Sequence, residues 1–174
     1  MTEYKELAGQ LFNANIYKEF MEHLDAFAHK MAITDFDAKT KEKYTDDIEE
    51  YYFHYFRTRQ LEADFAHFSR ESDKFSELYE KTKDPKKEAQ YKKNFYETQK
   101  ILSNIKHHHE LAKEDRKMAT PAAQKANIAA EERIAELEAE RKQKNQKKKH
   151  NNFIIIKKIN CSLRVERLFF NMKI

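Results

Sequence analysis

The sequence predicts an all-α protein: an antiparallel bundle of three to four long helices with a coiled-coil-like fourth helix and an irregular basic C-terminal tail. Three observations lead to this fold class. The 174 residues include one Gly and two Pro, so the chain has few places to turn. Aromatic residues make up 13% of the chain, enough to supply a core. Large apolar side chains recur at steps of three and four residues, the period of one helix face.

The N-terminal residues 3–33 are expected to form the first helix. One face of it carries Tyr4, Leu7, Leu11, Ala14, Tyr17, Phe20, Leu24, Phe27 and Met31. The step of three from Ala14 to Tyr17 breaks the four-three phase at Asn13-Ala14-Asn15. Because Asn is a weak helix former, we expect a local distortion of the helix there.

Residues 44–79 hold 10 of the 22 aromatic residues and neither Gly nor Pro, and they predict the central helix of the bundle. Residues 34–44 are expected to be a polar connection, with Thr45 as the N-cap of a helix that runs to about Lys81. Charged residues interrupt the aromatic stripe in residues 57–64. We interpret that window as a solvated turn or a place where the packing partner changes, with a functional polar layer as the alternative.

Two cap-then-proline pairs predict the starts of the remaining helices. Asp84-Pro85 opens the third, whose buried line of residues is expected to be Tyr91, Phe95, Thr98, Leu102, Ile105, His109 and Ala112. Thr120-Pro121 is expected to open a fourth, over residues 121–148, with Asn127, Ala130, Ile134 and Leu137 on its narrow apolar face. The predicted organisation is a core bundle over 1–119, a polar helix over 120–149 and a tail over 150–174.

The charge is distributed unevenly along the chain. Residues 1–140 carry 23 Lys and Arg against 29 Asp and Glu, whereas residues 141–174 carry 11 against one. Six of these cations are clustered at Arg141, Lys142, Lys144, Lys147, Lys148 and Lys149. Three interpretations of the cluster are open: a solubilising charged end, a contact for the phosphates of a nucleic acid, and a contact for an anionic membrane surface.

The tail differs in composition from the rest of the chain, being rich in Asn, Lys and Ile. Ile159, Cys161, Leu163 and Val165 alternate with polar residues, which predicts either a short strand or a disordered segment. Its apolar run at 153–156 is far shorter than a membrane span. A lone Cys161 and an acidic N-terminal MTEYKE without an apolar segment favour a cytoplasmic protein.

A metal-binding bundle is the alternative function from a different class. His67 and Glu71 share a helix face at i,i+4, and His29 and His109 are the candidates on neighbouring helices. The paired Glu-x-x-His repeats of di-metal bundles are absent, and Asp64-x-x-His67 is the single approximation. In His107-His108-His109 successive rings point about 100° apart, so they cannot converge on one ion. We interpret His109 as half-buried and its two neighbours as solvated.

The sequence predicts no enzyme and no cofactor. Cys161 has no neighbouring His, and the single Gly9 lies within a helical pattern, so neither a nucleophile nor a phosphate-cradling loop can be assigned. The expected function is a non-enzymatic interaction or scaffolding protein. We expect it to be a homo-oligomer or to bind a helical partner through Ala130, Ile134 and Leu137, with the basic segment contacting an acidic partner.

Overall fold

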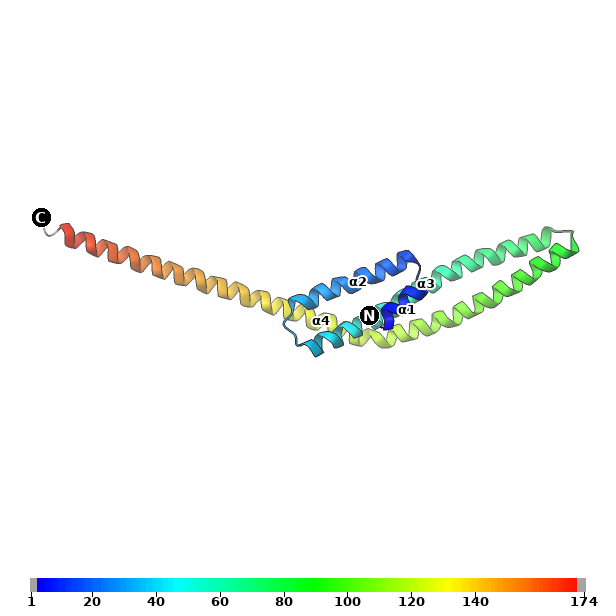
Figure 1. Cartoon of the computed structure of the whole chain (residues 1–174), viewed down its shortest axis with the longest axis horizontal. Helices are drawn as coiled ribbons and strands as arrows, with labels where there is room; N and C mark the ends of the chain where they lie inside the picture. The colour runs from blue at the N-terminus through cyan, green and yellow to red at the C-terminus, as the bar shows by residue number, and fades with distance from the viewer. Residues whose placement is uncertain (1–2, 172–174) are drawn as a thin grey trace. The chain divides into compact units, whose positions relative to one another are not determined.

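The computed structural model describes the backbone of residues 3–171 and the side chains of residues 3–148. The described backbone forms α1 (Glu3–Leu11), α2 (Ala14–Ile33), α3 (Ala38–Lys81) and α4 (Pro85–Asn171), with no strand among these residues (Figure 1). The predicted all-α class is therefore confirmed. The chain divides into two compact units, Met1–Ala130 and Glu131–Ile174, and α4 contributes to both.

Within the first unit, α3 and the first part of α4 form an antiparallel helical hairpin. Residues close to the turn pair with each other, since Gln99 Nε2 donates to Ser72 Oγ at 2.6 Å. Residues far from the turn also pair, as His54 and Asp115 do. Asp84 Oδ1 accepts a hydrogen bond from the Lys86 N–H at 2.9 Å, which confirms the predicted start of a helix at Pro85.

The predicted first helix is divided at the two asparagines into α1 and α2. Asn13 is the N-cap of α2, and its Oδ1 accepts from the N–H groups of Asn15 and Ile16 at 3.1 and 3.0 Å. Such caps satisfy amides that have no partner inside the helix. The expected local distortion is thus a complete break, and it lets α1 and α2 each pack against α3.

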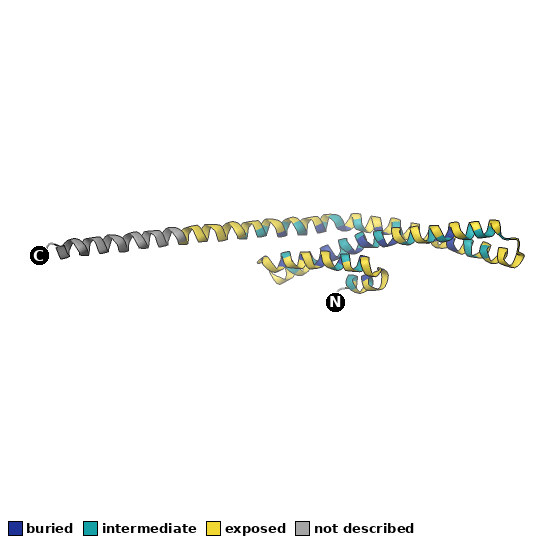
Figure 2. Cartoon of the chain, turned by 90° about the horizontal axis from the view of Figure 1, so that it is seen from above, coloured by how far each residue is buried: buried dark blue, intermediate teal, exposed yellow. Residues whose placement is uncertain are grey.

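The core of the first unit forms where α1 and α2 lie along the N-terminal half of α3 (Figures 1 and 2). Phe12 stacks on Phe53 with 5.6 Å between the ring centroids, and Phe20 packs edge-on against Phe56 with 6.1 Å between the centroids. Phe20 and Phe56 are fully buried. The rings of the predicted central helix that are buried are Phe53 and Phe56, whereas Tyr44, Tyr51 and Tyr55 are half-buried against them. Towards the turn, Leu61, Ile105 and Ala112 form a smaller core between α3 and α4 alone.

The second predicted helix begins earlier than expected. α3 starts at Ala38, and its N-cap is Asp37, whose Oδ1 accepts from the Thr40 N–H at 3.0 Å. Thr45 is not a cap, because it lies inside the helix and its hydroxyl donates to the Lys41 carbonyl at 2.8 Å. Asp37 and Thr45 both have side chains that can cap a helix, and the helix starts at the earlier of the two.

The predicted start of a fourth helix at Thr120-Pro121 is wrong, because α4 continues through Pro121. The Thr120 hydroxyl donates to the Arg116 carbonyl at 2.7 Å, as it does within a helix. Four alanines on one face of α4 are buried on both sides of the proline: Ala119, Ala123, Ala126 and Ala130. This packing offsets the missing proline N–H, so the helix is not interrupted.

The backbone of the predicted tail is helical to Asn171, so the irregular segment and the short strand over 159–165 are corrected. A helix satisfies its own backbone groups, whereas a lone strand leaves its N–H and C=O groups without partners. Residues 172–174 lie outside the described part of the chain.

Candidate functional site

The basic segment of α4 is the exposed charged surface that the sequence singled out. Arg141, Lys142, Lys144, Lys147 and Lys148 are all exposed, while the side chain of Lys149 lies outside the described residues. Four of the five cations, together with Asn145, line a shallow hollow on the helix surface: Arg141, Lys144, Lys147 and Lys148. Lys142 is not part of that lining. Among the described side chains, no carboxylate lies within ion-pair distance of these cations.

An acidic stretch precedes the basic segment on the same helix. Residues 131–140 contain five Glu and one Arg. Arg133 Nη1 lies 2.6 Å from Glu136 and 3.7 Å from Glu140, so its charge is balanced within the stretch. The positive surface therefore begins at Arg141, immediately after Glu140.

The three residues proposed for self-association have different environments. Ala130 is fully buried in the core of the first unit, so its side chain is not available to a second copy. Ile134 and Leu137 belong to the second unit and are half-buried. The association surface predicted from the sequence is reduced to these two.

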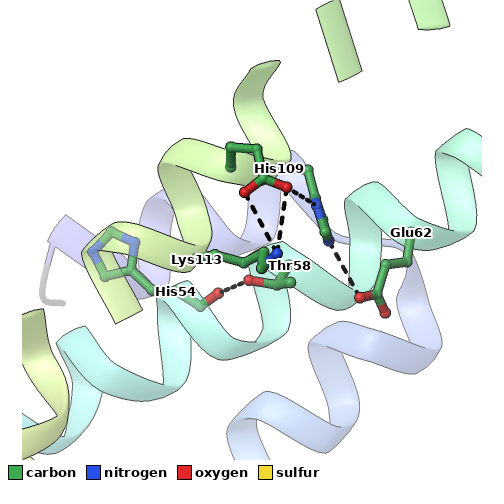
Figure 3. A network of polar contacts seen from close by, with 6 residues as sticks. His54, Thr58, Glu62, His109 and Lys113 are labelled. Atoms are coloured by element: carbon green, nitrogen blue, oxygen red, sulfur yellow. Dashed lines mark hydrogen bonds and ion pairs between the residues drawn. The ribbon is translucent and has the colours of Figure 1, made fainter. Parts of the chain in front are cut away.

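His109 belongs to a ladder of polar contacts between α3 and α4 (Figure 3). Its Nε2 lies 3.2 Å from Glu62 and its Nδ1 lies 3.5 Å from Glu110. Lys113 Nζ donates to Glu110 at 3.3 Å, and this hydrogen bond is the main reason why the pKa of Glu110 is lowered. His109 is half-buried and His107 and His108 are exposed, as predicted.

A second histidine, His54, is more deeply enclosed. The centroid of its ring lies 6.1 Å from that of Tyr4 and 5.3 Å from that of Phe53, and its Nδ1 lies 3.7 Å from Asp115 Oδ2. Burial lowers the pKa of His54, and the nearby Asp115 and Glu50 carboxylates oppose that shift. Since desolvation is the largest cause, the neutral imidazole is favoured.

The polar window at residues 57–64 of α3 lies against the break between α1 and α2. Gln60 is buried, and its Oε1 accepts from both the backbone N–H and the side-chain amide of Asn13 at 2.9 and 3.0 Å. Its own Nε2 donates to Asp64 at 2.8 Å. Arg59 pairs with Glu19 of α2. The packing partners of α3 change here, because the core shared with α1, α2 and the alanines of α4 gives way to a core shared with α4 alone.

Two features of the first unit were not predicted from the sequence. Glu49 is almost completely buried in α3, and its Oε1 lies 2.6 Å from Lys5 Nζ of α1. Glu49 lies four residues after Thr45 and seven before Phe56, so it shares a helix face with them, and this spacing could have predicted its burial. The second feature is a cleft of about 280 Å³ between α3 and α4, walled by Leu61, Phe65 and Ile105 and edged by Glu62, Lys106 and His109.

The residues of the alternative metal site are not gathered. His29 is on α2, His67 and Glu71 are on α3, and His109 is on α4, where it contacts Glu62 and Glu110. The described residues contain no group of three or more His, Cys, Asp or Glu side chains arranged to hold a metal ion.

Comparisons with protein-family models, curated proteins and solved structures found no match to this chain. Over the described residues, no helix contains a stretch long and apolar enough to cross a membrane.

Proposed function

We propose that this chain is a non-enzymatic, cytoplasmic interaction protein that self-associates through the second unit and contacts a nucleic acid through its basic segment. The observation that carries the proposal is a contrast in charge pairing. In the first unit, the charged groups at helix contacts face partners, as in Lys5–Glu49, Arg59–Glu19 and His109–Glu62. The five described cations after Glu140 are exposed instead.

Self-association is supported by the composition of residues 131–148. Ile134 and Leu137 are their only large apolar residues, and the remainder are Ala or polar. An isolated helix of this kind is marginal in water, because most helical stability in proteins comes from packing an apolar face. Pairing Ile134 and Leu137 with a second copy would supply that packing.

Light scattering over a concentration series tests self-association. We expect a molar mass above the 21.0 kDa of one chain, rising with concentration. The double variant Ile134→Lys with Leu137→Lys should return the mass to that of one chain. The matched control places the same two charges at exposed Ala135 and Ala139 and should associate like the wild type. A wild-type mass of 21.0 kDa at every concentration would refute self-association.

Binding of labelled nucleic acid at two salt concentrations tests the basic segment. The full chain should bind at low salt and weaken steeply as salt rises, because phosphate contacts release condensed counterions. A variant with Gln at Arg141, Lys142, Lys144, Lys147 and Lys148 should lose this binding. Equal binding by the variant would show that these five cations are not the contact.

A further inference from the structure

The cations of the basic segment are not spread evenly around α4. A helix turns by about 100° per residue, so Arg141, Lys144 and Lys148 lie within a sector of about 60°, and Lys147 lies about 60° beyond Lys144. Lys142 lies about 100° to the other side of Arg141. The hollow on the helix surface agrees with this geometry, because it is lined by the first four and excludes Lys142. We call Arg141, Lys144, Lys147 and Lys148 the cationic face.

The acidic stretch limits how far a polyanion can follow this helix. Five Glu in residues 131–140 would repel phosphates, so contact is confined to residues from Arg141 onwards. The eight residues 141–148 span about 12 Å of helix axis. Double-stranded DNA carries one charge per about 1.7 Å of axis, so it can present a phosphate to each member of the cationic face over this short length.

The side chains of the segment do not suit a single strand. Proteins that hold single-stranded nucleic acids stack the bases on aromatic rings. No Phe, Tyr or Trp occurs between Tyr96 and Phe153, so residues 131–148 offer no ring for stacking. A bare helix about 10–12 Å wide, by contrast, fits a major groove about 12 Å wide.

We propose that the partner of the basic segment is a nucleic acid duplex, whose phosphates bind the cationic face of α4 with no dependence on base sequence. This inference rests on the proposed function, because it specifies the partner of the same segment. It adds the duplex form, the face of the helix that makes contact and the independence of sequence.

Fluorescence anisotropy of the full chain with three probes tests the partner. The probes are a 20-base-pair DNA duplex, a second duplex of unrelated sequence and one of the separated strands, each about 20 nucleotides long. We expect the Kd values of the two duplexes to agree within about twofold. The Kd of the single strand should be at least about tenfold higher. From about 50 to 200 mM salt, four phosphate contacts should weaken duplex binding by about 100-fold.

Two triple variants that lose the same charge test whether the cationic face makes the contact. Arg141→Gln with Lys144→Gln and Lys148→Gln removes most of the cationic face. The control, Lys100→Gln with Lys117→Gln and Lys125→Gln, removes three exposed cations outside the basic segment. We expect the dependence of log Kd on log salt to fall by about three for the first variant and by less than one for the control. Unchanged circular dichroism confirms that both variants fold.

The outcomes separate this inference from the proposed function. Tighter binding of the single strand, or equal losses for the two triple variants, would overturn the duplex and face assignment but leave nucleic-acid binding in place. Discrimination between the two duplexes of more than about tenfold would overturn independence of sequence. Failure to bind any of the three probes at low salt, with binding to vesicles containing anionic lipid, would overturn both proposals.

Discussion

Gln60 shows how one polar side chain can specify the arrangement of three segments. Its carbonyl oxygen accepts two hydrogen bonds from Asn13, the residue at which α1 ends and α2 begins, and its amide donates to Asp64. A buried donor or acceptor costs free energy when it loses its partner. Gln60 therefore favours the observed break at Asn13 over a continuous helix, and it does so from a position 47 residues further along the chain.

Replacing Gln60 with Leu should lower the free energy of unfolding by about 1–2 kcal/mol, because it removes the acceptor of the Asn13 N–H and side-chain amide and the donor to Asp64. Urea denaturation of both proteins measures the difference. Gln124→Leu, at an exposed position of α4, is the matched control and should change stability by no more than about 0.5 kcal/mol. Equal stability of the Gln60 variant and the wild type would contradict the role assigned to this side chain.

His54 should make stability depend on pH. Its folded pKa is depressed below the ordinary value of 6.5, mainly by burial. The unfolded chain therefore binds the proton more readily, so this contribution to stability is complete above the ordinary pKa and is lost as the pH falls through it. His54→Gln should flatten the change in unfolding free energy between about pH 7.5 and 5.5, as urea denaturation at both values would show.

His108 provides the comparison for that experiment. It is exposed, so His108→Gln should leave the pH dependence of stability as it is in the wild type. If His54→Gln and His108→Gln had the same effect, the pH dependence would not come from burial of the His54 ring.

At the scale of helices, local capping signals predicted some boundaries and failed at others. Asp84-Pro85 marks a true start, because α3 ends at Lys81 and the chain reverses direction before α4 begins at Pro85 (Figure 1). Thr120-Pro121 has the same local chemistry, yet the helix continues, because Ala119 before the proline is buried and Ala123, Ala126 and Ala130 after it are buried in the main core. The first case could be predicted from sequence, whereas the second depends on a tertiary contact that local sequence does not encode.

Pro121→Ala should raise the free energy of unfolding by about 1–3 kcal/mol, because alanine restores a backbone N–H and removes the steric cost of a proline inside a helix. Urea denaturation checks the value, with Gln124→Ala as a nearby exposed control that should change stability by less than about 0.5 kcal/mol. A loss of stability in Pro121→Ala would indicate that the native chain needs a helix boundary at this position.

The candidate sites follow the same division between local and tertiary information. The basic run was visible because charge is a property of composition, and His109 because it falls on the regular buried line of the third predicted helix. The partnership of Glu49 with Lys5, and that of Gln60 with Asn13, join residues more than 40 positions apart. No short-range spacing connects such residues, so these contacts could not be predicted without the fold.

At the scale of the whole molecule, the two units differ in their apolar residues and in the exposure of their charges. The first unit buries aromatic rings of α1, α2 and α3 and contains ion pairs between its helices, Lys5–Glu49 and Arg59–Glu19. The second unit has two half-buried apolar residues and an exposed cationic face in its described part. We expect folding to depend on the first unit, and association and nucleic-acid contact to depend on residues 131–148.

Hydrogen–deuterium exchange of the full chain over a concentration series tests this division most directly. Amides of the core stretch of α3, residues 48–61, should be strongly protected at every concentration, because they lie within the packed aromatic core. Amides of residues 131–148 should exchange rapidly in dilute protein and become protected as concentration rises, because a second copy then covers Ile134 and Leu137. Rapid exchange over 48–61, or exchange over 131–148 that does not change with concentration, would contradict the account.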